Sequence, residues 1–349
     1  MTTEIVIIDA DNIDSSEHGI KYAAEIIKSG GLVVFPTETV YGLGADATSS
    51  VAANKIYEAK GRPSDNPLII HIANPEDAEK YTYTSDLYYR LAKSFMPGPL
   101  TVIMTAKDSI PKETRGGLPT VAVRCPENRI ARRLISLSGV PIAAPSANLS
   151  GSPSPTTAAH VIDDMMGRVD MIIDGGECEF GLESTIVKIE SDGTLTLLRP
   201  GKITPEELSR VAEVKIADAV LNKLREGEIA ESPGMKYRHY APAAPVILLD
   251  GEREFQIDYI TRENGKNAAI ICYSEDAPAF REAFSGQKVY EFGNRDDEIT
   301  QAHKLFALLR ELDKQSYEKI YAPLPKATGI GLALYNRMIR AAAHRIIKL

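Results

Sequence analysis

The 349-residue sequence is poor in cysteine and has no long apolar run. Its three cysteines are Cys125, Cys178 and Cys272; none is paired at metal-ligand spacing, and an odd number does not suit a disulfide framework. We therefore expect reduced thiols and a cytoplasmic location. No apolar run approaches the roughly 18 residues of a membrane helix. The first residues also lack the basic region and apolar core of a signal peptide, so we expect no membrane association.

Positive charge is in deficit, with 40 lysines and arginines against 48 aspartates and glutamates, a net charge of −8. This balance argues against general adsorption to nucleic acid, and the chain has no aromatic stacking motif. A local basic pocket is still compatible with it. The 44% of apolar and 25% of charged residues are ordinary for a globular protein. The length suits about two domains.

The most informative stretch runs from Phe35 to Gly44, directly after the short apolar run Leu32–Val34. Pro36 ends the predicted strand because proline has no N–H for a strand ladder. Three hydroxyl side chains, one carboxylate and two glycines then follow within eight residues. Polar loops at strand ends are where α/β proteins usually bind ligands. An ordinary polar turn is the alternative for this stretch taken alone.

Two further stretches have the same character. A helix capped by Ser49 or Ser50 is predicted to end at Lys60, and Arg62 follows it. These two cations could complement the helix dipole or clamp a phosphate. Later, a predicted strand enters the polar stretch Ala143–Gly151.

The three stretches, in this order, resemble the YrdC-like family of threonylcarbamoyl-AMP synthases. Thr120–Arg124 and Gly181–Thr185 add to the resemblance, which covers about residues 15 to 212. The remainder looks like the extra C-terminal domain of the two-domain members. The resemblance implies a nucleotidyltransferase that joins L-threonine, bicarbonate and ATP into threonylcarbamoyl-AMP and pyrophosphate. The product would pass to a tRNA threonylcarbamoyl transferase, which modifies adenosine in tRNA, and we expect no stable nucleic-acid binding by this chain.

Residue by residue, the resemblance also implies two ligand sets. The ATP set, in which Lys60 and Arg62 are the candidate catalytic residues, is Lys60, Arg62, Asn66, Thr120, Ser146, Asn148, Ser154, Arg199 and Tyr237. The threonine set is Thr39, His71, Arg124, the backbone at Ala144, and Ser184. Arg124 is the natural bidentate partner of the amino-acid carboxylate, whereas His71 taken alone could be a hydrogen-bonded core residue. Mg²⁺ is expected with ATP, although the sequence offers no dedicated carboxylate cage for it.

The predicted fold class is α/β throughout. Residues 1–212 are expected to form the YrdC-like catalytic domain, a twisted mixed sheet with helices. Residues 245–349 are expected to form a smaller, Rossmann-like α/β domain that ends in a helix over Leu332–Ile347. Residues 213–244 would be a linker and active-site lid, because Ser232–Pro242 is too aromatic and cationic for a passive linker. A linker packed on the nearer domain is the alternative.

Two other functions fit the residues less well. The basic groups could grip RNA in a binding module, which predicts salt-sensitive binding without ATP turnover. The same nucleotide site could instead serve a carbamoyl transferase or an ATP hydrolase. Pyrophosphate release that depends on threonine would separate all three.

Overall fold

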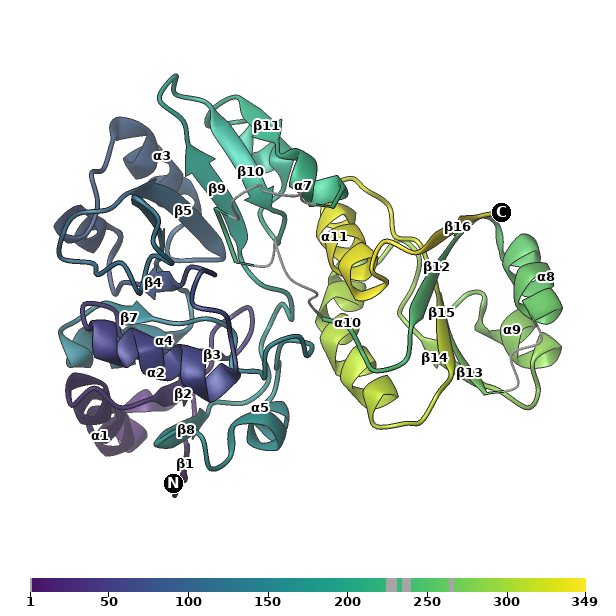
Figure 1. The fold of residues 1–349 in the computed structure, drawn as a ribbon, viewed down its shortest axis with the longest axis horizontal. Coiled ribbons are helices and arrows are strands. Elements are labelled where there is room, and N and C mark those ends of the chain that lie inside the picture. Colours follow the sequence, from purple (N-terminus) through teal and green to yellow (C-terminus); the bar gives the residue numbers. More distant parts are fainter. Residues whose placement is uncertain (1, 224–230, 234–239, 264–266) are drawn as a thin grey trace. The chain divides into compact units, whose positions relative to one another are not determined.

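The computed structural model describes residues 2–223, 231–233, 240–263 and 267–349 (Figure 1). These residues fall into two compact units, one of Met1–Ser150 with Ser154–Lys236 and one of Gly151–Pro153 with Tyr237–Leu349. Residues 224–230 and 234–239 of the predicted linker and lid, Tyr237 among them, lie outside the described residues. The lid and the nucleotide contact of Tyr237 therefore stay predictions.

The first unit is built on a mixed sheet that has eleven strands among the described residues. In spatial order the strands are β1 (Glu4–Ile7), β8 (Met171–Asp174), β2 (Val33–Phe35), β3 (Gly42–Asp46), β7 (Ile142–Ala143), β4 (Ile69–His71), β6 (Thr120–Arg124), β5 (Leu100–Thr105), β9 (Thr185–Ile189), β10 (Leu195–Arg199) and β11 (Val214–Ile216). The helices are η1 (Ile13–Ser16), α1 (Glu17–Lys28), α2 (Ser50–Lys60), η2 (Pro75–Lys80), α3 (Asp86–Phe95), α4 (Arg129–Ser138), α5 (Ala158–Met165), α6 (Pro205–Leu208) and α7 (Asp218–Leu221). The predicted mixed α/β class is confirmed for this unit.

The core beside the first polar stretch explains why glycine is needed at position 44. Helices α1 and α4 cover β2 with buried side chains that include Ile27 and Leu134. We expected Gly42 and Gly44 to belong to a loop, but they form β3, antiparallel to β2. A Cβ on Gly44 would lie 2.7 Å from the Phe35 ring and 2.8 Å from Ile142. Glycine therefore lets the buried aromatic ring pack directly on the strand.

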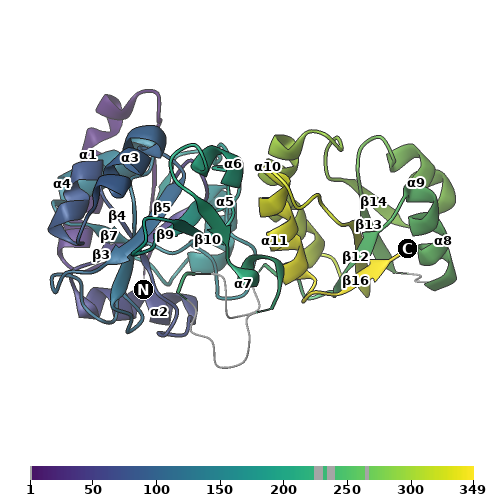
Figure 2. The same ribbon diagram turned by 90° about the horizontal axis from the view of Figure 1, so that it is seen from above.

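The second unit contains a five-stranded, all-parallel sheet in the described residues. Its strands, in spatial order, are β14 (Lys288–Glu291), β13 (Ala268–Cys272), β15 (Lys319–Pro323), β12 (Val246–Asp250) and β16 (Ile346–Lys348). Helices α10 (Glu298–Asp313) and α11 (Gly331–Ala341) lie on one face of the sheet, and α8 (Arg253–Glu263) and α9 (Ala277–Ala283) on the other (Figure 2). This three-layer arrangement confirms the α/β class predicted here.

The predicted final helix over Leu332–Ile347 is wrong in its second half. Helix α11 ends at Ala341, and Ala343 and His344 then adopt positive φ values of 48° and 63°. The chain continues as β16, which pairs in parallel with β12. The apolar residues near the end of the sequence therefore complete the sheet, because pairing along β12 overrides the local helical pattern.

Candidate active site

The first polar stretch folds into a buried turn between β2 and β3. The Thr37 hydroxyl donates to the Val40 carbonyl at 2.7 Å and accepts from the Thr39 and Val40 amides at 3.1 and 3.2 Å. With its proton and both lone pairs used in this way, the Thr37 hydroxyl lies 2.8 Å from that of the fully buried Thr39. The Thr37 side chain therefore holds the turn together around Thr39.

The structure brings the first and the third polar stretch together with the segment that precedes β9. The turn at Glu38–Leu43 is joined to the residues after β7 and to the residues before β9 by backbone hydrogen bonds of 2.8 to 3.1 Å. These run from Tyr41 N to Pro155 O, Leu43 N to Pro145 O, Ala147 N to Tyr41 O, Phe180 N to Glu38 O and Gly181 N to Thr39 O. The three loops therefore form one backbone-linked cluster.

The residues expected to bind threonine lie around one row of neighbouring residues across the strands of the sheet. His71 on β4, Arg124 on β6 and Thr101 on β5 are register neighbours. The Thr101 hydroxyl lies 2.8 Å from that of Ser184, and the Ala144 amide donates to the carbonyl of Ile69, two residues before His71, at 2.9 Å. Strand pairing thus places His71, Arg124, Ala144 and Ser184 in one neighbourhood, and Thr39 lies next to it in the turn.

His71 is a buried and neutral imidazole. Its side chain is 3% exposed, and Nδ1 lies 3.3 Å from the Ile142 carbonyl. Burial, and then the positive charge of Arg124, lowers the pKa of His71 to about 3. Because a carbonyl can only accept, Nδ1 carries the proton, and Nε2 remains a hydrogen-bond acceptor.

Arg124 is bound by a carboxylate to which the sequence alone assigned no role. Its Nη2 lies 2.7 Å from Oε1 of Glu38, and both side chains are 5% exposed. Glu38 stands between Thr37 and Thr39, inside the first polar stretch. A lone carboxylate in a strand-end loop was a weak signal for this, since its partner is 86 residues away along the chain.

Three members of the ATP set form a second cluster at the end of α2. The Lys60 ammonium, in a residue 2% exposed, lies 2.5 Å from both the Ser146 and Asn148 carbonyls. The Ser146 hydroxyl donates to Oδ1 of Asn148 at 2.5 Å, and the Ser150 amide donates to the Lys60 carbonyl at 2.9 Å. Lys60 therefore holds the Ser146–Asn148 loop in place, which goes beyond complementing a helix dipole.

Arg62 and Asn66 form the turn that follows this helix. Gly61 ends α2 in the left-handed conformation, with φ of 61°, so glycine is favoured there. The Arg62 guanidinium donates to the carbonyls of Asn66 and Pro67 at 3.0 to 3.3 Å. Oδ1 of the buried Asn66 side chain has no partner among the described residues.

The remaining ATP candidates are more dispersed. The Arg199 guanidinium donates to the Ser184 carbonyl at 2.9 Å and hydroxyl at 3.0 Å, which places it beside the threonine set. Ser154 is buried and donates to Glu183. Thr120 begins β6, about 13 Å along the strand from Arg124 at the usual rise per residue. Thr120 therefore lies away from the row that His71, Arg124 and Thr101 form across the sheet.

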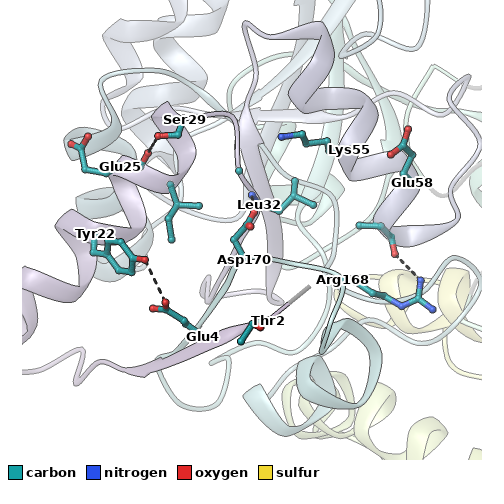
Figure 3. A pocket seen from close by; sticks show the side chains of 13 residues that line it. Thr2, Glu4, Tyr22, Glu25, Ser29, Leu32, Lys55, Glu58, Arg168 and Asp170 are labelled. Carbon is teal, nitrogen blue, oxygen red and sulfur yellow. Dashed lines mark hydrogen bonds between the residues drawn. The ribbon is translucent and has the colours of Figure 1, made fainter.

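A pocket elsewhere on the first unit contains none of the predicted site residues. It has a volume of about 810 Å³ and opens where β2 and β8 begin (Figure 3). Carboxylates of Glu4, Glu25, Glu58 and Asp170 line it together with Lys55 and Arg168. Because the polar loops lie where β2 ends, this pocket is separate from the candidate site.

Two kinds of structure are absent from the described residues. No helix there is long and apolar enough to span a membrane. No group of three or more histidine, cysteine, aspartate or glutamate side chains is arranged there to hold a metal ion.

The fold and the loop cluster together define a class of protein. A buried site with cations, hydroxyls and amides at strand ends suits the positioning of small anionic reactants. Residues 25–201 match the family model described as telomere recombination, which groups Sua5, YciO and YrdC proteins. Residues 203–343 match the model described as the C-terminal domain of threonylcarbamoyl-AMP synthase. The chain belongs to this family, and the resemblance inferred from the motifs is confirmed.

Similar proteins cover nearly the whole chain. The threonylcarbamoyl-AMP synthase of Pyrococcus abyssi is 44% identical over 95% of this chain and 96% of its own length. The threonylcarbamoyl-AMP synthase of Bacillus subtilis is 42% identical over 97% of both chains. The crystal structure of P. abyssi Sua5 complexed with L-threonine matches with a TM-score of 0.88 and 41% identity, over 99% of this chain and 100% of that one.

Proposed function

We propose that this chain is an L-threonylcarbamoyladenylate synthase, which condenses L-threonine, bicarbonate and ATP into threonylcarbamoyl-AMP and pyrophosphate. The observation that carries the proposal is full-length identity of 42 to 44% to two proteins named as threonylcarbamoyl-AMP synthases. The threonine-bound structure of P. abyssi Sua5 supports threonine as the amino acid. The clustering of the predicted polar loops in this chain supports a site for such reactants.

The reaction requires mainly that threonine, the carbamate and ATP are held in the correct positions. The threonine amine forms a carbamate with bicarbonate-derived CO2, and a carbamate oxygen then attacks the α-phosphorus of ATP as pyrophosphate leaves. Arg124 would hold the threonine carboxylate, and the neutral His71 would offer Nε2 as an acceptor. The Lys60–Ser146–Asn148 cluster and Arg62 would place the nucleotide phosphates. Each contact acts through charge and geometry in a buried site, where such contacts are effective.

We also propose that Mg²⁺ arrives with ATP. The described residues contain no carboxylate or histidine cluster for it, and the groups at the end of α2 are mainly an ammonium, amides and hydroxyls. Such a donor set suits phosphate and does not suit a protein-held cation, so the triphosphate itself would carry the ion. When bound, Mg²⁺ neutralises part of the phosphate charge.

The test is pyrophosphate release from ATP with bicarbonate, supplying each amino acid in turn. We expect release only with threonine, and the mass of threonylcarbamoyl-AMP in the products. If release is unchanged when threonine or bicarbonate is omitted, the chain is a hydrolase or a different transferase. Tight, salt-sensitive RNA binding without turnover would favour the RNA-binding alternative. We propose that the product passes to a tRNA threonylcarbamoyl transferase; tRNA modification in a mixture of the two proteins would test this step.

A further inference from the structure

The ion pair between Glu38 and Arg124 is incompletely bonded. Oε1 of Glu38 contacts Nη2 of Arg124 at 2.7 Å, in side chains that are 5% exposed. Oε2 of Glu38 and Nε of Arg124 are also buried, yet neither has a hydrogen-bond partner among the described residues. The ion pair therefore contains one carboxylate oxygen that accepts no hydrogen bond and one guanidinium N–H that donates none among the described residues.

This pattern is costly unless something completes it. Buried polar atoms in proteins nearly always have partners, and a buried ion pair is favourable only when its remaining donors and acceptors are bonded. A buried acceptor and a buried donor left open in the same pair, where Arg124 lies between its register neighbours His71 and Thr101, point to a ligand with both kinds of group.

An α-amino acid carries such groups on neighbouring atoms, a carboxylate and an ammonium. We propose that Glu38 is a second anchor of the amino-acid site: the carboxylate of the substrate accepts from Nε of Arg124, and its ammonium donates to Oε2 of Glu38. This inference rests on the proposed function and adds a residue to it. Glu38 would thereby select an amino acid over a hydroxy acid and would orient the nitrogen that becomes the carbamate.

The experiment removes the carboxylate charge of Glu38 from the protein and, separately, the ammonium charge from the ligand. Calorimetry on the full chain, without bicarbonate, would compare L-threonine with 2,3-dihydroxybutanoate of matching configuration, which has a hydroxyl in place of the ammonium. For the wild type we expect threonine to bind at least about tenfold more tightly, as for a charge-assisted hydrogen bond. Glu38→Gln keeps an acceptor for Arg124 but can place an amide N–H toward the ammonium. It should therefore abolish most of the preference by weakening threonine alone.

Two further variants serve as controls. Glu25→Gln makes the same change in an exposed residue of α1 that pairs with Lys28, and should leave both affinities unaltered. Arg124→Ala should weaken both ligands, because the carboxylate is common to them. If Glu38→Gln fails to fold, Glu38→Asp keeps the carboxylate and should retain the preference for threonine; its loss in folded Glu38→Asp would overturn the proposal.

The outcomes separate this inference from the proposed function. Equal weakening of both ligands by Glu38→Gln would mean that Glu38 only supports Arg124, and unchanged binding of both would mean that it has no role; either result overturns the inference. Failure of wild-type threonine to bind or to be turned over would instead overturn the proposed function.

Discussion

The substitution Lys60→Met tests whether the ammonium at the end of α2 holds the neighbouring loop. Methionine keeps an unbranched side chain of similar volume, so the packing of the buried stem changes little. The change removes the donors that contact the Ser146 and Asn148 carbonyls at 2.5 Å. Any effect on the loop then comes mainly from those lost contacts.

The expected loss of stability is large. A hydrogen bond to a charged group contributes about 1.5–3 kcal/mol, so two such bonds would contribute about 3–6 kcal/mol if they were additive. Water that reaches the freed carbonyls would reduce this figure. Even the lower value is a substantial part of the 5–15 kcal/mol or so that stabilises a typical domain.

Two measurements check this expectation. The free energy of unfolding in denaturant should fall by about 3 kcal/mol or more, and hydrogen exchange in the peptide that spans residues 143–151 should accelerate. Lys55→Met is the matched control, because Lys55 lies on the same helix and is exposed, and its ammonium donates to the Gly30 carbonyl at 2.6 Å. That variant should stay within about 0.5 kcal/mol of the wild type. Unchanged unfolding and exchange in Lys60→Met would refute the loop-holding role and leave phosphate binding as the better explanation of Lys60.

Two further predictions concern the threonine row. Arg124→Lys should raise the KM for threonine by about tenfold or more while the KM for ATP changes little, because a point charge cannot replace the guanidinium fork; equal rises in both constants would assign Arg124 to general support of the site. His71 should make stability depend on pH, since its pKa is about 3 when folded and returns to about 6.5 on unfolding. Between these values the unfolded chain binds the extra proton, so lowering the pH should cost up to about 1.4 kcal/mol per pH unit. Denaturant titrations at pH 7 and pH 5 should show a smaller difference for His71→Gln than for the wild type, and an identical difference would contradict the buried, neutral imidazole.

Local patterns in the sequence predicted most elements and the position of the polar loops. The strand expected before Pro36 is observed as β2, and the helix expected to follow Ser49 or Ser50 and to end at Lys60 is observed as α2, because proline ends the strand and a serine caps the helix. The same reasoning failed at β16, where an apolar segment joins a strand that lies about 100 residues earlier in the chain. Local propensity does not contain that pairing.

In the candidate site, too, local patterns predicted the position of single residues but not their long-range partners. The sequence placed Lys60 at a helix end and Glu38 in a strand-end loop, but their partners lie 86 to 88 residues away. No spacing rule connects such residues. The grouping of the ligand sets could be expected only from the family resemblance, and the structure adds which atoms of this chain bind one another.

Strand register explains how residues so far apart can form a precise site. His71, Arg124 and Thr101 lie side by side on β4, β6 and β5, and Thr101 contacts Ser184, which Arg199 also holds. A slip of one residue in β6 would turn Arg124 to the opposite face of the sheet, away from Glu38. The apolar residues of these strands therefore do more than fill the core. By fixing the register, they fix where the charges and hydroxyls of the site stand, so the geometry needed for recognition is set by the same packing that makes the first unit stable.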